Sequence, residues 1–299
     1  MAAIEALANL GYKVNANELL VKLADDTPYQ FAVNPLDKTF NQRHYEEVGG
    51  VMTQLICERL VNECGLVAQN VPLDAQEGEP TSAIFMSPGS LQSDKPLLLL
   101  VPGMSIQVGQ WARKIVINEN VYKGSMLEYV HRAQTLEGYN VLITNNNLNH
   151  VNDELIRGSE SPQKHVQYVW ENLVARAATN RVLVVAHSFG GVCMQSLVQR
   201  LDKREDESIE KLAAIALTDS VHGYGGMFGG ASDYSNRGRR NQAFGRLCTN
   251  FVASDLKLGE EIGVDSDGVR LVSAGSEHHD QTTVVAIDHV FAFLKEKKE

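Results

Sequence analysis

A short run near the middle of the chain, residues 181–191, constrains the fold more than any other stretch. It reads Arg-Val-Leu-Val-Val-Ala-His-Ser-Phe-Gly-Gly, an apolar strand that leads through a serine into a predicted helix. A serine on a sharp strand-to-helix turn needs small residues two positions before and after it. Ala186 and Gly190 meet this need, although the usual G-x-S-x-G pattern has Gly at the first position. The run predicts a nucleophile elbow at Ser188, and the alternative is a buried strand followed by an ordinary N-capping serine.

Apolar strands and helices alternate on both sides of this run. Strands are expected at 82–87, 97–101, 139–144, 181–187, 213–218 and 269–273, and helices near 125–137, from Ser161, over 191–201 and near 282–296. Strands that are apolar throughout and separated by helices are typical of a parallel sheet with helices on both faces. The sequence therefore predicts an α/β fold with a mostly parallel sheet.

The chain is expected to form a single domain over residues 1–299, because no internal repeat or persuasive linker divides it. Within residues 1–80, a polar hairpin over 9–34 and a helix from about Asn41 to Cys64 are expected to pack on the sheet. Residues 222–268 are expected to form an insertion that begins with a Gly-rich stretch. That stretch, 222–230, is interpreted as a lid or a simple excursion of the chain.

Composition excludes several classes of protein. No apolar run approaches the roughly 20 residues that cross a bilayer, and the first residues lack the basic and apolar parts of a signal peptide. The four cysteines show no zinc-ligand spacing. A reducing compartment, the nucleus or the cytoplasm, is therefore expected, with no metal and no other cofactor. A formal net charge of −10 argues against nucleic-acid binding except near Arg237, Arg239 and Arg240, where a solvated turn is the alternative.

Three side chains suited to hydrolysis follow three predicted strands, in the chain order Ser188, Asp219, His279. The carboxyl ends of parallel strands gather functional residues, and this order is that of the α/β-hydrolases. A serine hydroxyl is a weak nucleophile at neutral pH, so an imidazole must accept its proton while a carboxylate orients the ring. The sequence thus predicts an α/β-hydrolase-like fold with these three as catalytic residues, acting on a small acyl substrate.

Alternatives stay open at two of these positions. Asp219 follows the strand directly after the elbow strand, whereas many hydrolases carry the acid one strand later; Asp265 and Asp267 are the fallback acids. His278 is interpreted as a solvent-facing neighbour of the base. His187 is expected to pack against or orient the site. A metal site built from His222, His278, His279 and Asp219 lacks supporting ligand spacing.

The oxyanion of a hydrolytic intermediate must be met by backbone N–H groups. The first is expected from Phe189, directly after the serine, and the second from the turn that follows residues 97–101. Pro102 has no N–H, so Met104 is the predicted second donor. The amide-rich loop 145–149, which follows the strand predicted over 139–144, is interpreted as a solvated turn rather than a pocket wall.

The chain resembles the Argonaute-binding-protein domain family of eukaryotic silencing and chromatin factors. The motifs that carry the resemblance are Leu10-Gly-Tyr, Asn41-Gln-Arg-His-Tyr-Glu-Glu, Gly109-Gln-Trp-Ala-Arg-Lys with Ile117-Asn-Glu, Ala186-His-Ser-Phe-Gly-Gly, Ala216-Leu-Thr-Asp-Ser-Val-His222 and Ser273-Ala-Gly-Ser-Glu-His-His279. The family pattern matches His279 rather than His278, and the Gly-rich stretch 223–230 departs from it.

This resemblance implies an α/β-hydrolase-like fold with the nucleophile at Ser188. It also implies Argonaute-like, splicing or chromatin proteins as partners. Two functions follow: a serine hydrolase for an ester, thioester or amide, or a catalytically silent adaptor in nuclear RNA-silencing, splicing or histone-deacetylase complexes. The two hypotheses differ in whether Ser188 reacts.

Overall fold

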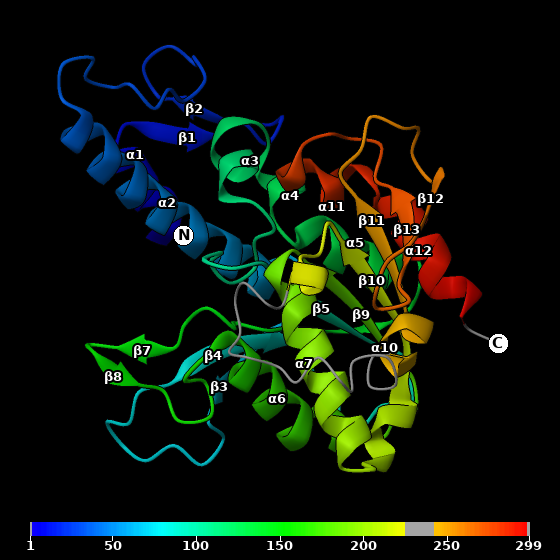
Figure 1. Cartoon of the computed structure of the whole chain (residues 1–299). Coiled ribbons are helices and arrows are strands. Elements are labelled where there is room, and N and C mark those ends of the chain that lie inside the picture. The colour runs from blue at the N-terminus through cyan, green and yellow to red at the C-terminus, as the bar shows by residue number, and fades with distance from the viewer. Residues whose placement is uncertain (1, 225–241, 298–299) are drawn as a thin grey trace.

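A mixed sheet of nine strands forms the centre of the computed structural model, which describes residues 2–224 and 242–297 (Figure 1). The order across the sheet is β12-β13-β11-β10-β9-β5-β6-β4-β3. The strands are β3 (Val67–Val71), β4 (Ser82–Met86), β5 (Leu97–Val101), β6 (Asn140–Ile143), β9 (Val182–His187), β10 (Leu212–Thr218), β11 (Cys248–Val252), β12 (Glu261–Val264) and β13 (Arg270–Ser273). Pairing is parallel from β6 to β13, and β3, β4 and β12 pair antiparallel.

Helices cover both faces of this sheet. They are α1 (Ala2–Asn9), α2 (Lys38–Asn62), α3 (Arg113–Asn118), α4 (Val121–Gly124), α5 (Leu127–Thr135), α6 (Pro162–Asn172), α7 (Phe189–Lys203), α10 (Gln242–Leu247), α11 (Thr282–Val285) and α12 (Ile287–Glu296). Successive side chains of a strand point to opposite faces, and β5 shows this directly. Leu98 and Leu100 pack in the same core as residues of α5 and α12, whereas Leu97 and Leu99 pack with α6 and α7.

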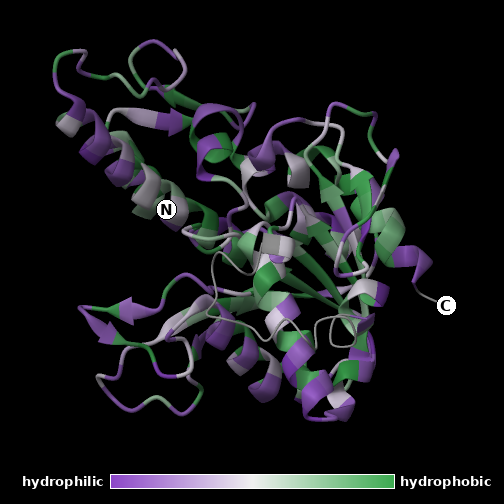
Figure 2. Ribbon diagram, in the orientation of Figure 1, coloured by the Kyte–Doolittle hydropathy of each residue, from purple (hydrophilic) through white to green (hydrophobic). Residues whose placement is uncertain are grey.

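The apolar strands explain this arrangement. Every residue of β5 and of β9 is buried, and the central strands are the hydrophobic part of the molecule in Figure 2, with polar residues on the outer sides of the helices. A strand buried on both faces is expected to be mostly apolar. The predicted α/β fold with helices on both faces of a mostly parallel sheet is confirmed.

Local signals in the sequence placed most of these elements correctly. The Ser161 side chain caps α6 by accepting a hydrogen bond from the Lys164 N–H, and Pro162 is the first helical residue. The predicted hairpin is present as β1 (Tyr12–Val14) paired antiparallel with β2 (Leu20–Lys22). A second small hairpin, β7 (His150–Val151) with β8 (Glu154–Leu155), was not predicted.

Seven further elements were not predicted from the sequence: α1, α3, α4, α10, β3, β11 and β12. Three of them, α10, β11 and β12, come from residues 222–268, which were expected to be an insertion. Strand β11 instead lies inside the sheet, between β10 and β13. Within the described parts of the chain, no helix is long and apolar enough to cross a membrane.

Candidate functional site

The predicted elbow is present between β9 and α7. Ser188 stands there at φ 52° and ψ −119°, a strained conformation for a residue with a side chain. The residues around Ser188 must be small because other parts of the backbone lie very close to them. A Cβ on Gly190 would lie 2.5 Å from the Val101 carbonyl oxygen, and one on Gly103 would lie 3.1 Å from the Cβ of Ser188. Strand β5 and the turn after it therefore approach the elbow at backbone contact distance.

Asp219 and His279 form a close pair at the same edge of the sheet. Asp219 directly follows β10, and its Oδ2 lies 2.6 Å from His279 Nδ1. The hydrogen bond with Asp219 raises the pKa of His279 against the opposing effect of burial. Burial raises the pKa of Asp219, but the hydrogen bonds from His279 and the Ala253 N–H outweigh it, and the net pKa is lowered. The pair therefore holds an ionised carboxylate against the imidazole.

Strand β11 fixes the position of this carboxylate, a role that the sequence did not reveal. The Phe251 carbonyl accepts a hydrogen bond from the Asp219 N–H at 2.8 Å. Asp219 Oδ1 accepts one from the Ala253 N–H at 3.0 Å. Both contacts come from the backbone at the end of β11, so no side-chain motif could have indicated them. They hold Asp219 at φ 45°, a second strained position beside the elbow.

His187 lies buried beneath His279. The two rings are 4.7 Å apart between centroids, and His187 Nδ1 lies 2.9 Å from the Thr218 carbonyl oxygen. A carbonyl only accepts, so Nδ1 carries the proton of a neutral ring. Burial, and next the charge of His279, lower the pKa of His187 to about 4. This fits the expected packing and orienting role.

Stability against unfolding is expected to fall as the pH drops from about 6.5 to about 4. His187 has an ordinary pKa of 6.5 and a folded pKa of about 4, so the unfolded chain binds more protons in this window and unfolding is favoured. The loss from this residue is on the order of 3 kcal/mol. Urea unfolding at pH 7.5 and 4.5 measures it, and an equal pH dependence in His187→Gln would contradict the assignment.

The predicted fallback acids lie elsewhere. Asp265 Oδ2 is 2.9 Å from Nε2 of the buried His222, whose Nδ1 lies 2.8 Å from the Ser220 hydroxyl. Asp267 accepts a hydrogen bond from the Gln195 amide at 2.9 Å. Neither carboxylate contacts His279 in the described residues, so Asp219 alone of the three candidates pairs with the predicted base.

The remaining candidates are His278, a metal site and the basic cluster. His278 is exposed. Among residues 2–224 and 242–297, no group of three or more His, Cys, Asp or Glu side chains is arranged to hold a metal ion. The basic cluster Arg237, Arg239 and Arg240 and most of the Gly-rich stretch lie outside the described residues.

Ser188 is the predicted nucleophile, and Phe189 and Met104 are the predicted oxyanion donors. Within the described residues, no hydrogen bond joins Ser188 Oγ to His279, and such contacts are often long until a substrate binds. Phe189 is the first residue of α7, directly after the serine. Met104 is exposed in the turn after β5. These positions agree with the predicted roles without testing them.

The amide-rich loop after β6 has a structural role that the sequence analysis did not predict. Asn146 is fully buried and donates to the Pro102 carbonyl at 3.3 Å. Asn147 contacts the same turn through both ends of its side-chain amide. The interpretation of 145–149 as a solvated turn is therefore wrong for these two residues. The run of asparagines directly after a predicted strand was the one sequence feature that could have indicated this role.

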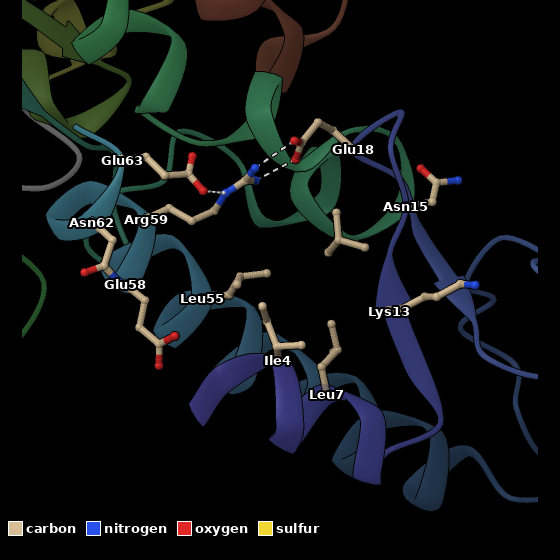
Figure 3. A pocket seen from close by; sticks show the side chains of 11 residues that line it. Ile4, Leu7, Lys13, Asn15, Glu18, Leu55, Glu58, Arg59, Asn62 and Glu63 are labelled. Atoms are coloured by element: carbon tan, nitrogen blue, oxygen red, sulfur yellow. Dashed lines mark hydrogen bonds and ion pairs between the residues drawn. The ribbon is translucent and has the colours of Figure 1, made fainter. Parts of the chain in front are cut away.

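A cavity of about 370 Å³ lies apart from these strand ends (Figure 3). Its lining comes from α1, α2 and the β1–β2 hairpin, with Ile4, Leu7 and Leu55 among its apolar residues. At its rim, the Arg59 guanidinium donates to both carboxylate oxygens of Glu18, at 2.6 and 2.7 Å. The cavity contains no residue of the predicted site.

Comparisons with known proteins agree over almost the whole chain. The Arb2 domain model matches residues 4–155 and 145–226. The human cotranscriptional regulator ARB2A is 28% identical, with 99% of this chain and 81% of the relative covered. A FAM172 family protein homolog from Caenorhabditis elegans is 32% identical, with 98% and 87% covered. The solved histone deacetylase Clr3 matches in fold over 92% of this chain and 42% of its own, with a TM-score of 0.54 and 14% identity. Because the family model matches more than half of the chain, the chain belongs to the Arb2 domain family.

Proposed function

We propose that the chain is a serine hydrolase that cleaves an ester, thioester or amide bond. Ser188 is the nucleophile, His279 the general base and Asp219 the residue that orients the base. The single observation that carries the proposal is the 2.6 Å pair between Asp219 and His279 at the strand ends beside the strained Ser188. Backbone strain of this kind is retained where the surrounding structure and function require it.

The reaction follows from the positions of these groups. As Ser188 Oγ bonds to the acyl carbon, its proton passes to His279 Nε2 and the carbonyl oxygen becomes an oxyanion. The N–H groups of Phe189 and Met104 are proposed to stabilise that oxyanion. The carbon then loses its leaving group, which takes the proton from His279. A water molecule then attacks the acyl-enzyme and gives its proton to His279. The bond to Ser188 Oγ breaks, the carboxylic acid is released, and His279 returns the proton to Ser188.

A fluorophosphonate probe tests this proposal directly, because it bonds to an activated serine and loses fluoride. Intact-mass measurement is expected to find a single adduct on the wild-type chain and none on Ser188→Ala. Ser220→Ala is the matched control, since this serine also lies near a histidine and a carboxylate, and its adduct is expected to persist. A folded wild-type chain that gains no adduct would overturn the proposal.

A second candidate is an adaptor without catalytic activity, in nuclear RNA-silencing, splicing or histone-deacetylase complexes. The names of relatives favour it, since one is a cotranscriptional regulator and another solved relative in fold is a histone deacetylase. These names also favour the nucleus over the cytoplasm. For an adaptor, Ser188→Ala leaves partner capture and cellular function intact. Loss of cellular function with normal partner capture would instead favour the hydrolase.

A further inference from the structure

We propose that Asn147 is a positioning residue that holds the oxyanion turn, residues 102–106, against the elbow. The inference rests on the proposed hydrolase function and adds a residue to it. The Asn147 side chain makes three hydrogen bonds, all to the backbone of this turn. Its Nδ2 donates to the carbonyls of Gly103 at 2.7 Å and Ile106 at 2.9 Å, and its Oδ1 accepts from the Ser105 N–H at 3.1 Å.

The position of Asn147 follows from the sheet. Strands β5 and β6 pair in parallel, with Leu100 opposite Ile143. The segments that leave their carboxyl ends are therefore neighbours, and the loop after β6 reaches the turn after β5. The adjacent Asn146 strengthens this contact, because it is buried and donates to the Pro102 carbonyl. Two successive amides thus connect one loop to the other.

The turn needs such support because its own backbone satisfies few of its polar groups. Pro102 has no N–H, and Ser105 stands at φ 61°, an unfavourable value for a serine. Asn147 supplies partners to one N–H and two carbonyls of this turn, groups that would otherwise rely on solvent. The proposed donor, the Met104 N–H, lies between the Gly103 and Ser105 groups that the amide holds.

Misplacement of this donor is expected to slow the chemical step. The turn lies close to the nucleophile, since a Cβ on Gly103 would lie 3.1 Å from the Ser188 Cβ. Loss of one oxyanion donor lowers turnover by about 100- to 1,000-fold. A donor that is displaced but not deleted is expected to cost the lower end of this range, about 100-fold. The effect belongs to the rate of bond formation rather than to binding of the probe.

The experiment measures how fast an alkyl fluorophosphonate reacts with Ser188, separating the rate of bond formation from the binding constant. In this reaction the Oγ–P bond forms, the P–F bond breaks and the serine proton passes to His279. Asn147→Ala is expected to lower the rate constant about 100-fold with the binding constant unchanged. Asn147→Asp keeps an acceptor for Ser105 but places a carboxylate against two carbonyls, and it is expected to be at least as slow.

Two further measurements separate positioning from simple loss of structure. Asn149→Ala is the matched control, because its amide donates to the Asn146 and Ser159 carbonyls and not to the turn. Its rate constant is expected to stay near the wild-type value. Hydrogen exchange of the Ser105 amide is expected to accelerate in Asn147→Ala and not in Asn149→Ala.

The outcomes are distinguishable. Wild-type chain without any adduct overturns the hydrolase proposal and this inference with it. Wild-type labelling together with an unchanged rate constant in both Asn147 variants overturns the inference alone. A slower reaction with unchanged exchange at Ser105 also overturns it, because Asn147 would then act by some route other than holding the turn.

Discussion

Asp219→Asn is expected to lower kcat for the proposed hydrolysis about ten-thousandfold while the chain stays folded. The Asp219 carboxylate accepts a hydrogen bond from the Nδ1–H of His279 at 2.6 Å, which leaves Nε2 free to accept the serine proton. An amide at this position favours the opposite tautomer, in which Nε2 already carries a proton. Hydrolysis of a p-nitrophenyl ester, followed through released nitrophenolate, measures the effect.

Asp265→Asn is the matched control for this substitution. Asp265 also contacts a histidine, but its partner is the buried His222 rather than His279. We expect Asp265→Asn to lower stability and to leave kcat near the wild-type value. An equal loss of kcat in the two variants would contradict a specific role of Asp219 in orienting His279. Unchanged kcat in Asp219→Asn would remove this residue from the proposed mechanism.

Gly190→Ala is expected to lower the free energy of unfolding by about 3 kcal/mol. The added Cβ would lie 2.5 Å from the Val101 carbonyl oxygen and 2.9 Å from that of Pro102. Both are backbone atoms of the central strand and its exit, so no flexible side chain can move aside. Relief requires α7 to shift away from β5. Urea unfolding followed by circular dichroism measures the change.

Gly50→Ala provides the contrast within the same chain. Gly50 lies exposed inside α2, and a Cβ there meets nothing within 4 Å. Alanine is the better helix former, so this substitution is expected to raise stability by about 0.5–1 kcal/mol. If Gly190→Ala unfolded at the wild-type urea concentration, the close approach of β5 to the elbow would be wrong.

The sequence predicted the parts of the fold whose signals are local. Leu97–Val101 is apolar throughout because both of its faces are buried, and Ser161 and Pro162 mark the start of α6. Strand β11 was not predicted because its sequence is Cys-Thr-Asn-Phe-Val, with polar residues at buried positions. The buried Asn250 is satisfied there by hydrogen bonds with the backbone of Ser220. Such a strand is recognisable only once its neighbours are known.

The candidate site also contains residues that the sequence predicted and residues that it did not. Asp219 was chosen because it directly follows a predicted strand, and it is the acid that pairs with His279. The Asn147 contacts could not be predicted, because they depend on which loop ends meet after β5 and β6. The His222–Asp265 pair was also unforeseen. Its two members are 43 residues apart, and no spacing rule connects them.

The place of β11 in the sheet has a consequence for which changes in chain length the molecule tolerates. Asp219 leaves β10, whereas His279 follows β13, two strand spacings or about 10 Å away. Residues 274–278 must bridge that width. The Ala274 N–H donates to the Val252 carbonyl at the end of β11, and the Ser276 carbonyl accepts from the Ser254 N–H just beyond it. Surface loops usually accept insertions and deletions. In this loop, by contrast, a gain or loss of a single residue is expected to move the imidazole out of reach of its carboxylate.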